Sequence, residues 1–106
     1  MPFRRVAFND LTLKLSGGHV TVESPSGNFT SRELEILELQ KDGYQDKEIA
    51  RILKISLNTV KNTLGHMRER EERTTTDLVV RAESDGLLSP DFINGINEFR
   101  SGKWRR

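Results

Sequence analysis

Apolar and polar residues alternate in three short segments near the amino terminus, at residues 4–8, 11–15 and 19–23. Alternation at period two is typical of half-buried strands. Gly17-Gly18, between the second and third segments, suits a tight hairpin because glycine adopts positive φ freely. We therefore expect a three-stranded antiparallel sheet over residues 4–23, whose apolar face packs on the rest of the chain. The residues expected on that face are Val6, Phe8, Leu11, Leu13 and Val20.

A strong helix start follows the strands. The intervening segment at 24–28, SPSGN, is a loop by composition. Thr30 is a good N-cap and Glu33 lies three residues on, so each can bond the backbone N–H of the other in a capping box. Gly43 is a natural stop, because glycine readily takes the left-handed conformation at a helix end. The first helix is therefore expected near residues 31–42.

Apolar residues recur at helical spacing through the rest of the chain and predict four further helices. The second helix ends in a brief break at Ile55-Ser56, and Ser56 caps the third. Two helices joined by a turn of three or four residues form a helix-turn-helix. The predicted class is mainly α, a helix-turn-helix bundle of four to five helices with a short amino-terminal antiparallel β-sheet. The expected helices lie near 46–53, 57–71, 76–85 and 90–100.

The third predicted helix has two unlike faces. Val60, Leu64 and Met67 cluster on one side at 100° per residue, which is the expected core face. The opposite side is polar around Gly65, although glycine costs about 1 kcal/mol relative to alanine in an exposed helix interior. Such a face suits the close approach of a large partner. Its residues are Asn58, Asn62, Gly65 and Glu69, flanked by Lys61 and His66.

The chemistry of this face favours double-stranded DNA as the partner. Asparagine can form two hydrogen bonds with adenine, and lysine can reach the acceptors of guanine. The hydroxyls of Ser56 and Thr59, at the helix N-terminus, can bind phosphate together with free backbone N–H groups. A solvated polar face is the simpler interpretation of an isolated helix. The capped helix, the short turn and the small polar face together favour DNA binding.

The segment from Phe29 to Met67 resembles the helix-turn-helix domain of LuxR-type transcription regulators. It contains an S-R-E-x-E-I-L opening, a glycine before the second helix, K-E-I-A, and I-S-x-x-T-V-K-N at the start of the third helix. The resemblance continues through TTTDLVVRAESDGLL and so covers residues 29–88. The strands before it are weakly similar to the small sheet that precedes the first helix in OmpR-type winged-helix effectors.

The resemblance implies that residues 56–69 enter the DNA major groove and that the fourth helix forms a symmetric dimer. The base-contacting positions of the family fall on Lys61, Asn62 and Gly65, of which the first two can make side-chain contacts. The expected DNA-binding residues are Ser56, Asn58, Thr59, Lys61, Asn62, Gly65, His66, Arg68 and Lys47. The expected dimer residues are Asp77, Val80, Arg81 and Ser84.

The sequence departs from the family pattern at two places. An aromatic residue or histidine is frequent where this chain has Thr63, and a polar side chain where it has Gly65. The usual Leu-Gly-Val turn after the recognition helix is replaced by Arg70-Glu71-Glu72, which removes two apolar anchors. We therefore expect the third helix to extend further.

The carboxy-terminal segment carries an apolar stripe and a basic tail. Phe92, Ile96 and Phe99 repeat at helical spacing, and they suit either a dimer interface or the cover of the β-sheet. The last seven residues, RSGKWRR, hold four basic side chains and no acidic one. Such a tail is either an auxiliary phosphate contact or a free, solvated end.

Length and composition fit one small domain. The chain has 106 residues, a net charge of +1 and no cysteine, which excludes disulfides and thiolate metal sites and fits a reducing cytoplasm. No apolar run approaches the length of a membrane span, and no signal peptide is apparent. The expected division is strands at 1–28, the helix-turn-helix domain at 29–88, and a helix and tail at 89–106. We expect no attached sensor domain.

Three classes of function remain to be weighed. An enzyme is disfavoured, because the chain has no phosphate-binding glycine loop, no HExxH and no thiol, and we expect no cofactor and no metal. Residues 48–70 also resemble the promoter-reading region four of sigma factors, which acts inside RNA polymerase. The alternative of another class is an interaction module that binds another regulator, which the acidic Glu69, Glu71 and Glu72 favour. DNA binding by a cytoplasmic homodimer is the leading hypothesis.

Overall fold

A computed structural model of the chain describes residues 3–8, 11–16 and 19–101, and it describes side chains over 11–15 and 20–99. Gly17-Gly18, the side chains of Val6 and Phe8, and most of the basic tail lie outside the described residues. The expectations for those residues therefore remain predictions.

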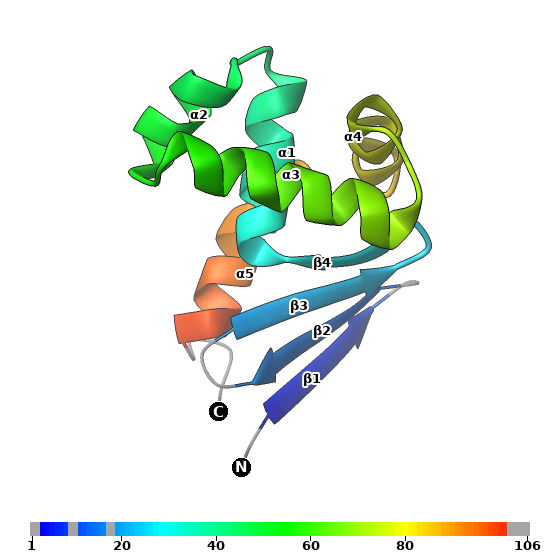
Figure 1. Cartoon of the computed structure of the whole chain (residues 1–106). Helices are drawn as coiled ribbons and strands as arrows, with labels where there is room; N and C mark the ends of the chain where they lie inside the picture. The colour runs from blue at the N-terminus through cyan, green and yellow to red at the C-terminus, as the bar shows by residue number, and fades with distance from the viewer. Residues whose placement is uncertain (1–2, 9–10, 17–18, 102–106) are drawn as a thin grey trace.

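A four-stranded antiparallel sheet forms one layer of the protein (Figure 1). Its strands are β1 (Phe3–Phe8), β2 (Leu11–Ser16), β3 (His19–Ser24) and β4 (Gly27–Thr30), and they pair in the order β1-β2-β3-β4. The three expected strands are confirmed. The expectation of a loop over 24–28 was wrong, because only Pro25 and Ser26 form the turn.

Strand β4 forms because of Phe29. Its ring is 1% exposed, and its backbone pairs with that of Val22 on β3, which is fully buried. Burying a large aromatic side chain against a sheet stabilises the strand that carries it. This strand is hard to predict from the sequence because it contains Gly27 and Asn28, which are residue types typical of turns. Gly27 has a φ of +132°.

Five helices follow the sheet and agree with the expected spans to within a residue. They are α1 (Ser31–Lys41), α2 (Asp46–Leu53), α3 (Leu57–Glu71), α4 (Thr75–Ser84) and α5 (Pro90–Ser101). In Figure 1, α3 crosses in front of α1 with α2 and α4 at its two ends, above the sheet. None of the described helices is long and apolar enough to cross a membrane.

The predicted capping box at the start of α1 is confirmed. The Thr30 side chain accepts the Glu33 N–H at 3.2 Å, and Glu33 Oε1 accepts the Thr30 N–H at 2.9 Å. Both hydrogen bonds join residues three positions apart, so they depend only on the local sequence. They set the point at which β4 becomes α1.

One hydrophobic core lies between the sheet and the helices. The inner face of the sheet supplies side chains that are at most 8% exposed, which confirms three of its five predicted residues. The buried residues of the sheet are Leu11, Leu13, Val20, Val22 and Phe29. From the helices, Leu34, Leu37 and Val60 are fully buried in the same cluster.

Helix α5 belongs to this core. Phe99 is fully buried and Ile96 is 1% exposed, and the helix contacts α1 and β3. Of the two interpretations of the apolar stripe, core packing is therefore the one observed. An interface between two chains cannot use side chains that the protomer itself encloses.

Phe99→Ala should lower the free energy of unfolding by about 3–5 kcal/mol, because it removes a fully buried ring and leaves a cavity. Glu83→Ala is the control, since Glu83 is exposed and lies outside the expected dimer residues, and a surface change stays within about 0.5 kcal/mol. Urea unfolding followed by circular dichroism measures both. Equal effects of the two substitutions would contradict the placement of α5 in the core.

Candidate nucleic-acid interface

Helices α2 and α3 form a helix-turn-helix whose turn is Lys54, Ile55 and Ser56. Ser56 is the N-cap of α3, as predicted: its Oγ accepts the Thr59 N–H at 3.0 Å and lies 2.8 Å from Thr59 Oγ1. The hydroxyls of Ser56 and Thr59, which we expect to bind a phosphate, are thus hydrogen-bonded to each other at the exposed N-terminus of α3. A hydroxyl oxygen can accept one bond and still donate its proton to a phosphate.

The two faces of α3 are as the sequence predicts. Val60 and Met67 are fully buried and Leu64 is 3% exposed, so they form the core face. On the opposite side five polar side chains are exposed and have no hydrogen bond or ion pair within the described part of the chain. These are Asn58, Lys61, Asn62, His66 and Glu69.

Gly65 lies on the exposed side of α3 with open space before it. A Cβ built there would meet only the Arg68 guanidinium, at 3.8 Å, which is an ordinary contact. No packing within the described chain therefore requires glycine at this position. The missing side chain leaves room for a partner outside the protein.

Basic side chains surround this face. Between residues 46 and 68 the chain has five basic and two acidic residues, although its total net charge is only +1. Both acids are occupied: Asp46 accepts a hydrogen bond from Gln40 at 2.7 Å, and Glu48 accepts the Gln45 N–H at 2.9 Å. Residues 46–68 therefore carry a net positive charge, which suits a polyanion.

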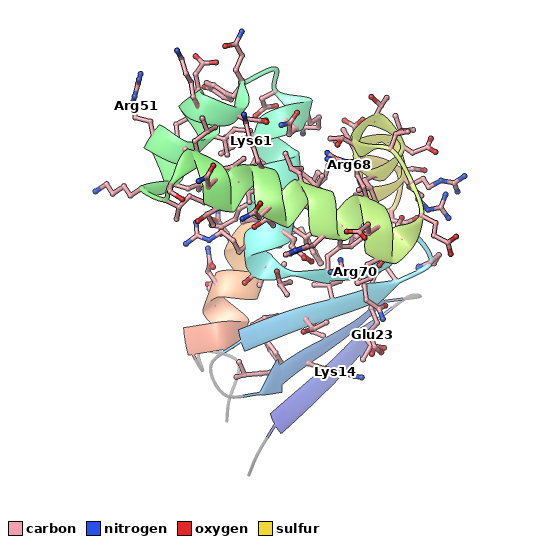
Figure 2. The ribbon with its side chains drawn as sticks, viewed as in Figure 1. Lys14, Glu23, Arg51, Lys61, Arg68 and Arg70 are labelled. Atoms are coloured by element: carbon pink, nitrogen blue, oxygen red, sulfur yellow. The ribbon has the colours of Figure 1, made fainter. Side chains whose placement is uncertain are left out.

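The basic side chains differ in whether they form hydrogen bonds within the protein. Arg68 donates from Nη1 to Thr75 Oγ1 at 3.0 Å, which links α3 to the start of α4. In Figure 2, Lys61 and Arg68 lie along one long edge of α3, whereas Arg70 lies on the edge toward the sheet. Lys47, on α2, is exposed as expected. The sequence analysis missed Arg51, an exposed arginine on the same helix.

Arg70 fastens the end of α3 to the sheet. Its Nη1 and Nη2 each donate to the Glu33 carboxylate at 3.0 Å, and Nη2 also donates to the Asn28 carbonyl at 2.8 Å. Its Nε donates to Glu71 at 3.0 Å, and Glu71 also accepts the Asn28 N–H at 3.4 Å. We call the side chains of Glu33, Arg70 and Glu71 the Arg70 clamp. Hydrogen bonding to Glu33 raises the pKa of the Arg70 guanidinium, so it stays charged.

The clamp explains the departure from the family pattern after the recognition helix. In place of apolar anchors, Arg70 and Glu71 supply polar ones, and α3 extends to Glu71 as expected. Glu71 is consequently half-buried against β4 and is not part of the exposed face. Only Glu69 and Glu72 remain exposed among the three acids that favoured an interaction module.

Arg70→Met should lower the free energy of unfolding by about 1–3 kcal/mol, because the Glu33 carboxylate, whose side chain is only 10% exposed, loses its charged partner. The double variant with Glu33→Gln should lose less than the sum of the two single changes, because it leaves neither charged partner of the pair without the other. Lys14→Met, which breaks the more exposed Lys14–Glu23 pair, should stay within about 1 kcal/mol. Additive effects in a urea-unfolding double-mutant cycle would show that the clamp does not stabilise the fold.

The expected dimer residues lie on the outer side of α4. Asp77, Val80, Arg81 and Ser84 are all exposed, while Leu78 and Ala82 are buried beneath them. Val80, at 58% exposed, is the most exposed of the large apolar side chains that the structure describes. The surface is thus free within one protomer.

The same helix is anchored from the other side. The hydroxyl of Ser26, in the β3–β4 turn, donates to the Arg81 carbonyl at 2.9 Å and contacts the Asp85 carboxylate. These contacts hold the carboxy-terminal end of α4 against the sheet and leave its outer side open.

Residues 27–72 match the family model of bacterial regulatory proteins, luxR family. The match runs from β4 to the end of α3, so it includes the Arg70 clamp and confirms the LuxR-type resemblance of this segment. The family is one of DNA-binding regulators and not of enzymes. No curated protein and no solved structure matches the chain.

Proposed function

We propose that this protein is a sequence-specific DNA-binding transcription regulator and that α3 enters the major groove. The observation that supports this most directly is the exposed face of α3. Asn58, Lys61 and Asn62 are exposed and have no partners in the described chain, and Gly65, one turn further along α3, leaves open space beside them. Side chains of these types read base edges, and the surrounding positive charge suits the phosphate backbone.

The interaction-module alternative has lost part of its support. It relied on acidic side chains beside the groove face, and Glu71 is bound to Arg70 and to the β4 backbone. Gln40 and Gln45 likewise hold the acids of α2. Lys47, Arg51 and Lys61 are exposed and have no partners in the described chain, and unpaired cations favour a nucleic acid over a basic protein partner. A regulator of this kind acts on the chromosome, so we propose a cytoplasmic location.

We further propose that the DNA-bound form is a homodimer through the outer side of α4. A twofold dimer would place two copies of α3 about 34 Å apart, one turn of DNA, and would select an inverted-repeat site. Val80 is the apolar centre of this surface, with Asp77, Arg81 and Ser84 around it.

Lys61→Ala and Asn62→Ala should each weaken specific DNA binding by about 1–3 kcal/mol, because each removes a base-edge contact. Both should leave the thermal midpoint nearly unchanged, since both side chains are exposed and unpaired. The probe is a duplex selected from a random pool by the unaltered protein, and binding is measured by fluorescence anisotropy.

Lys14→Ala is the matched control for Lys61→Ala, because it removes the same charge from the outer face of the sheet. It should leave the affinity for the selected duplex nearly unchanged. Full affinity in both the Lys61 and the Asn62 variants would favour the interaction module.

Val80→Glu should abolish the proposed dimer, because it introduces a charge at the apolar centre of the interface. Analytical ultracentrifugation over micromolar concentrations, with and without the selected duplex, measures the oligomeric state. Glu83→Ala, at another exposed position of α4, is the control and should leave the dimer intact. A monomer under every condition would rule out the dimer without affecting the proposal for α3.

A further inference from the structure

Four helices of this protein end with the same hydrogen-bond pattern. In each, one residue after the helix has positive φ, and the next N–H bonds the carbonyl five residues before it, at 2.9–3.1 Å. This is the Schellman motif, in which the left-handed residue is usually glycine. The four left-handed residues, in chain order, are Gly43 (φ 92°), Lys54 (φ 58°), Glu72 (φ 55°) and Gly86 (φ 78°).

Lys54 and Glu72 occupy positions where glycine would be more stable. An L-residue with a Cβ adopts the left-handed conformation at a cost that glycine avoids. The chain uses glycine after α1 and α4 and a charged residue after α2 and α3. Costly backbone conformations of this kind concentrate at functional positions. The backbone conformation is the same at Lys54 and Glu72, so it does not show which of them serves a function. Their locations and charges do.

Their locations differ. Lys54 lies in the turn of the helix-turn-helix, two residues before the N-cap of α3, whereas Glu72 follows α3 at its far end. In this motif the first helix crosses the DNA backbone and the second enters the groove, so the turn between them lies beside the phosphates.

The charges of the two residues differ as well, and the positive charge of Lys54 is available to bind a phosphate. Its side chain is exposed and has no hydrogen bond or ion pair with the described residues. Arg51 and Lys61, which flank it in sequence on α2 and α3, are likewise exposed and unpaired within that part of the chain. No carboxylate there competes with a phosphate for the Lys54 ammonium group.

We propose that Lys54 binds a backbone phosphate beside the groove that α3 enters, and that its left-handed backbone directs the side chain there at a cost in stability. This inference rests on the proposed function and adds a residue that the sequence analysis did not assign to the interface. A lysine acts on phosphate as a point charge, so the contact strengthens binding to every sequence equally.

Lys54→Gly and Glu72→Gly form a matched pair for the test. Each replaces a left-handed charged residue by glycine, so each should raise the thermal midpoint by about 2–6 °C. The probe for DNA binding is a mixed-sequence duplex of about 30 base pairs, or three helical turns, titrated at several KCl concentrations.

Only Lys54→Gly should weaken binding. We expect a loss of about five- to tenfold in affinity near 0.1 M salt and a decrease of about 1 in the slope of log affinity against log salt. Glu72→Gly should bind as tightly as the unaltered protein or slightly more tightly, with the same slope. Lys54→Arg should retain the slope, because it keeps the charge.

The outcomes separate this inference from the function on which it rests. An unchanged slope in Lys54→Gly, with normal binding by the unaltered protein, would overturn the role of Lys54 alone. Absence of DNA binding by the unaltered protein at low salt would overturn the proposed function together with it. A slope that falls equally in both glycine variants would assign the effect to the backbone and would also overturn the phosphate contact.

Discussion

The ion pair between Arg70 and Glu33 is the interaction that joins the end of α3 to the start of α1 beside the sheet. One carboxylate performs two tasks, since Glu33 caps α1 through the Thr30 N–H and receives two N–H groups from Arg70. The same guanidinium bonds the Asn28 carbonyl on β4. The start of α1, strand β4 and the end of α3 therefore share one network, and planar bidentate geometry makes it directional as well as strong. With its far end fixed, α3 cannot rotate about its axis without breaking these bonds.

This constraint determines which side of α3 is offered to a partner. Its core face is held by Val60, Leu64 and Met67, and its sheet-side edge by Arg70. What remains is the face around Gly65, where the polar side chains have no partners in the described chain. Preorganised, exposed groups on a rigid helix bind with little loss of conformational entropy.

Local stability is distributed unevenly between the two sides of the protein. Toward the sheet, the Ser26 hydroxyl, the Asn28 N–H and the Glu33 carboxylate each have a partner. Toward the proposed DNA face, the chain has a glycine in the middle of α3 and a lysine with a left-handed backbone. Each of these choices lowers the stability of the isolated protein by a small amount. Local departures from the most stable choice are expected where a surface serves binding.

The amino-acid sequence by itself determined the features that depend on near neighbours. The capping box of Thr30 and Glu33, the Ser56 cap and the two faces of α3 involve residues within one or two helical turns, so local patterns predicted them. Strand β4, the place of α5 and the partner of Arg70 were decided only in the tertiary structure. Arg70 and Glu33 lie 37 positions apart, and nothing near either residue in the sequence indicates the other. Similarly, a turn-like segment becomes a strand only because β3 is there to pair with it, and an apolar stripe becomes core only because the sheet and α1 leave it room. Such contacts depend on how the elements pack, and that packing follows from the energy of the whole chain.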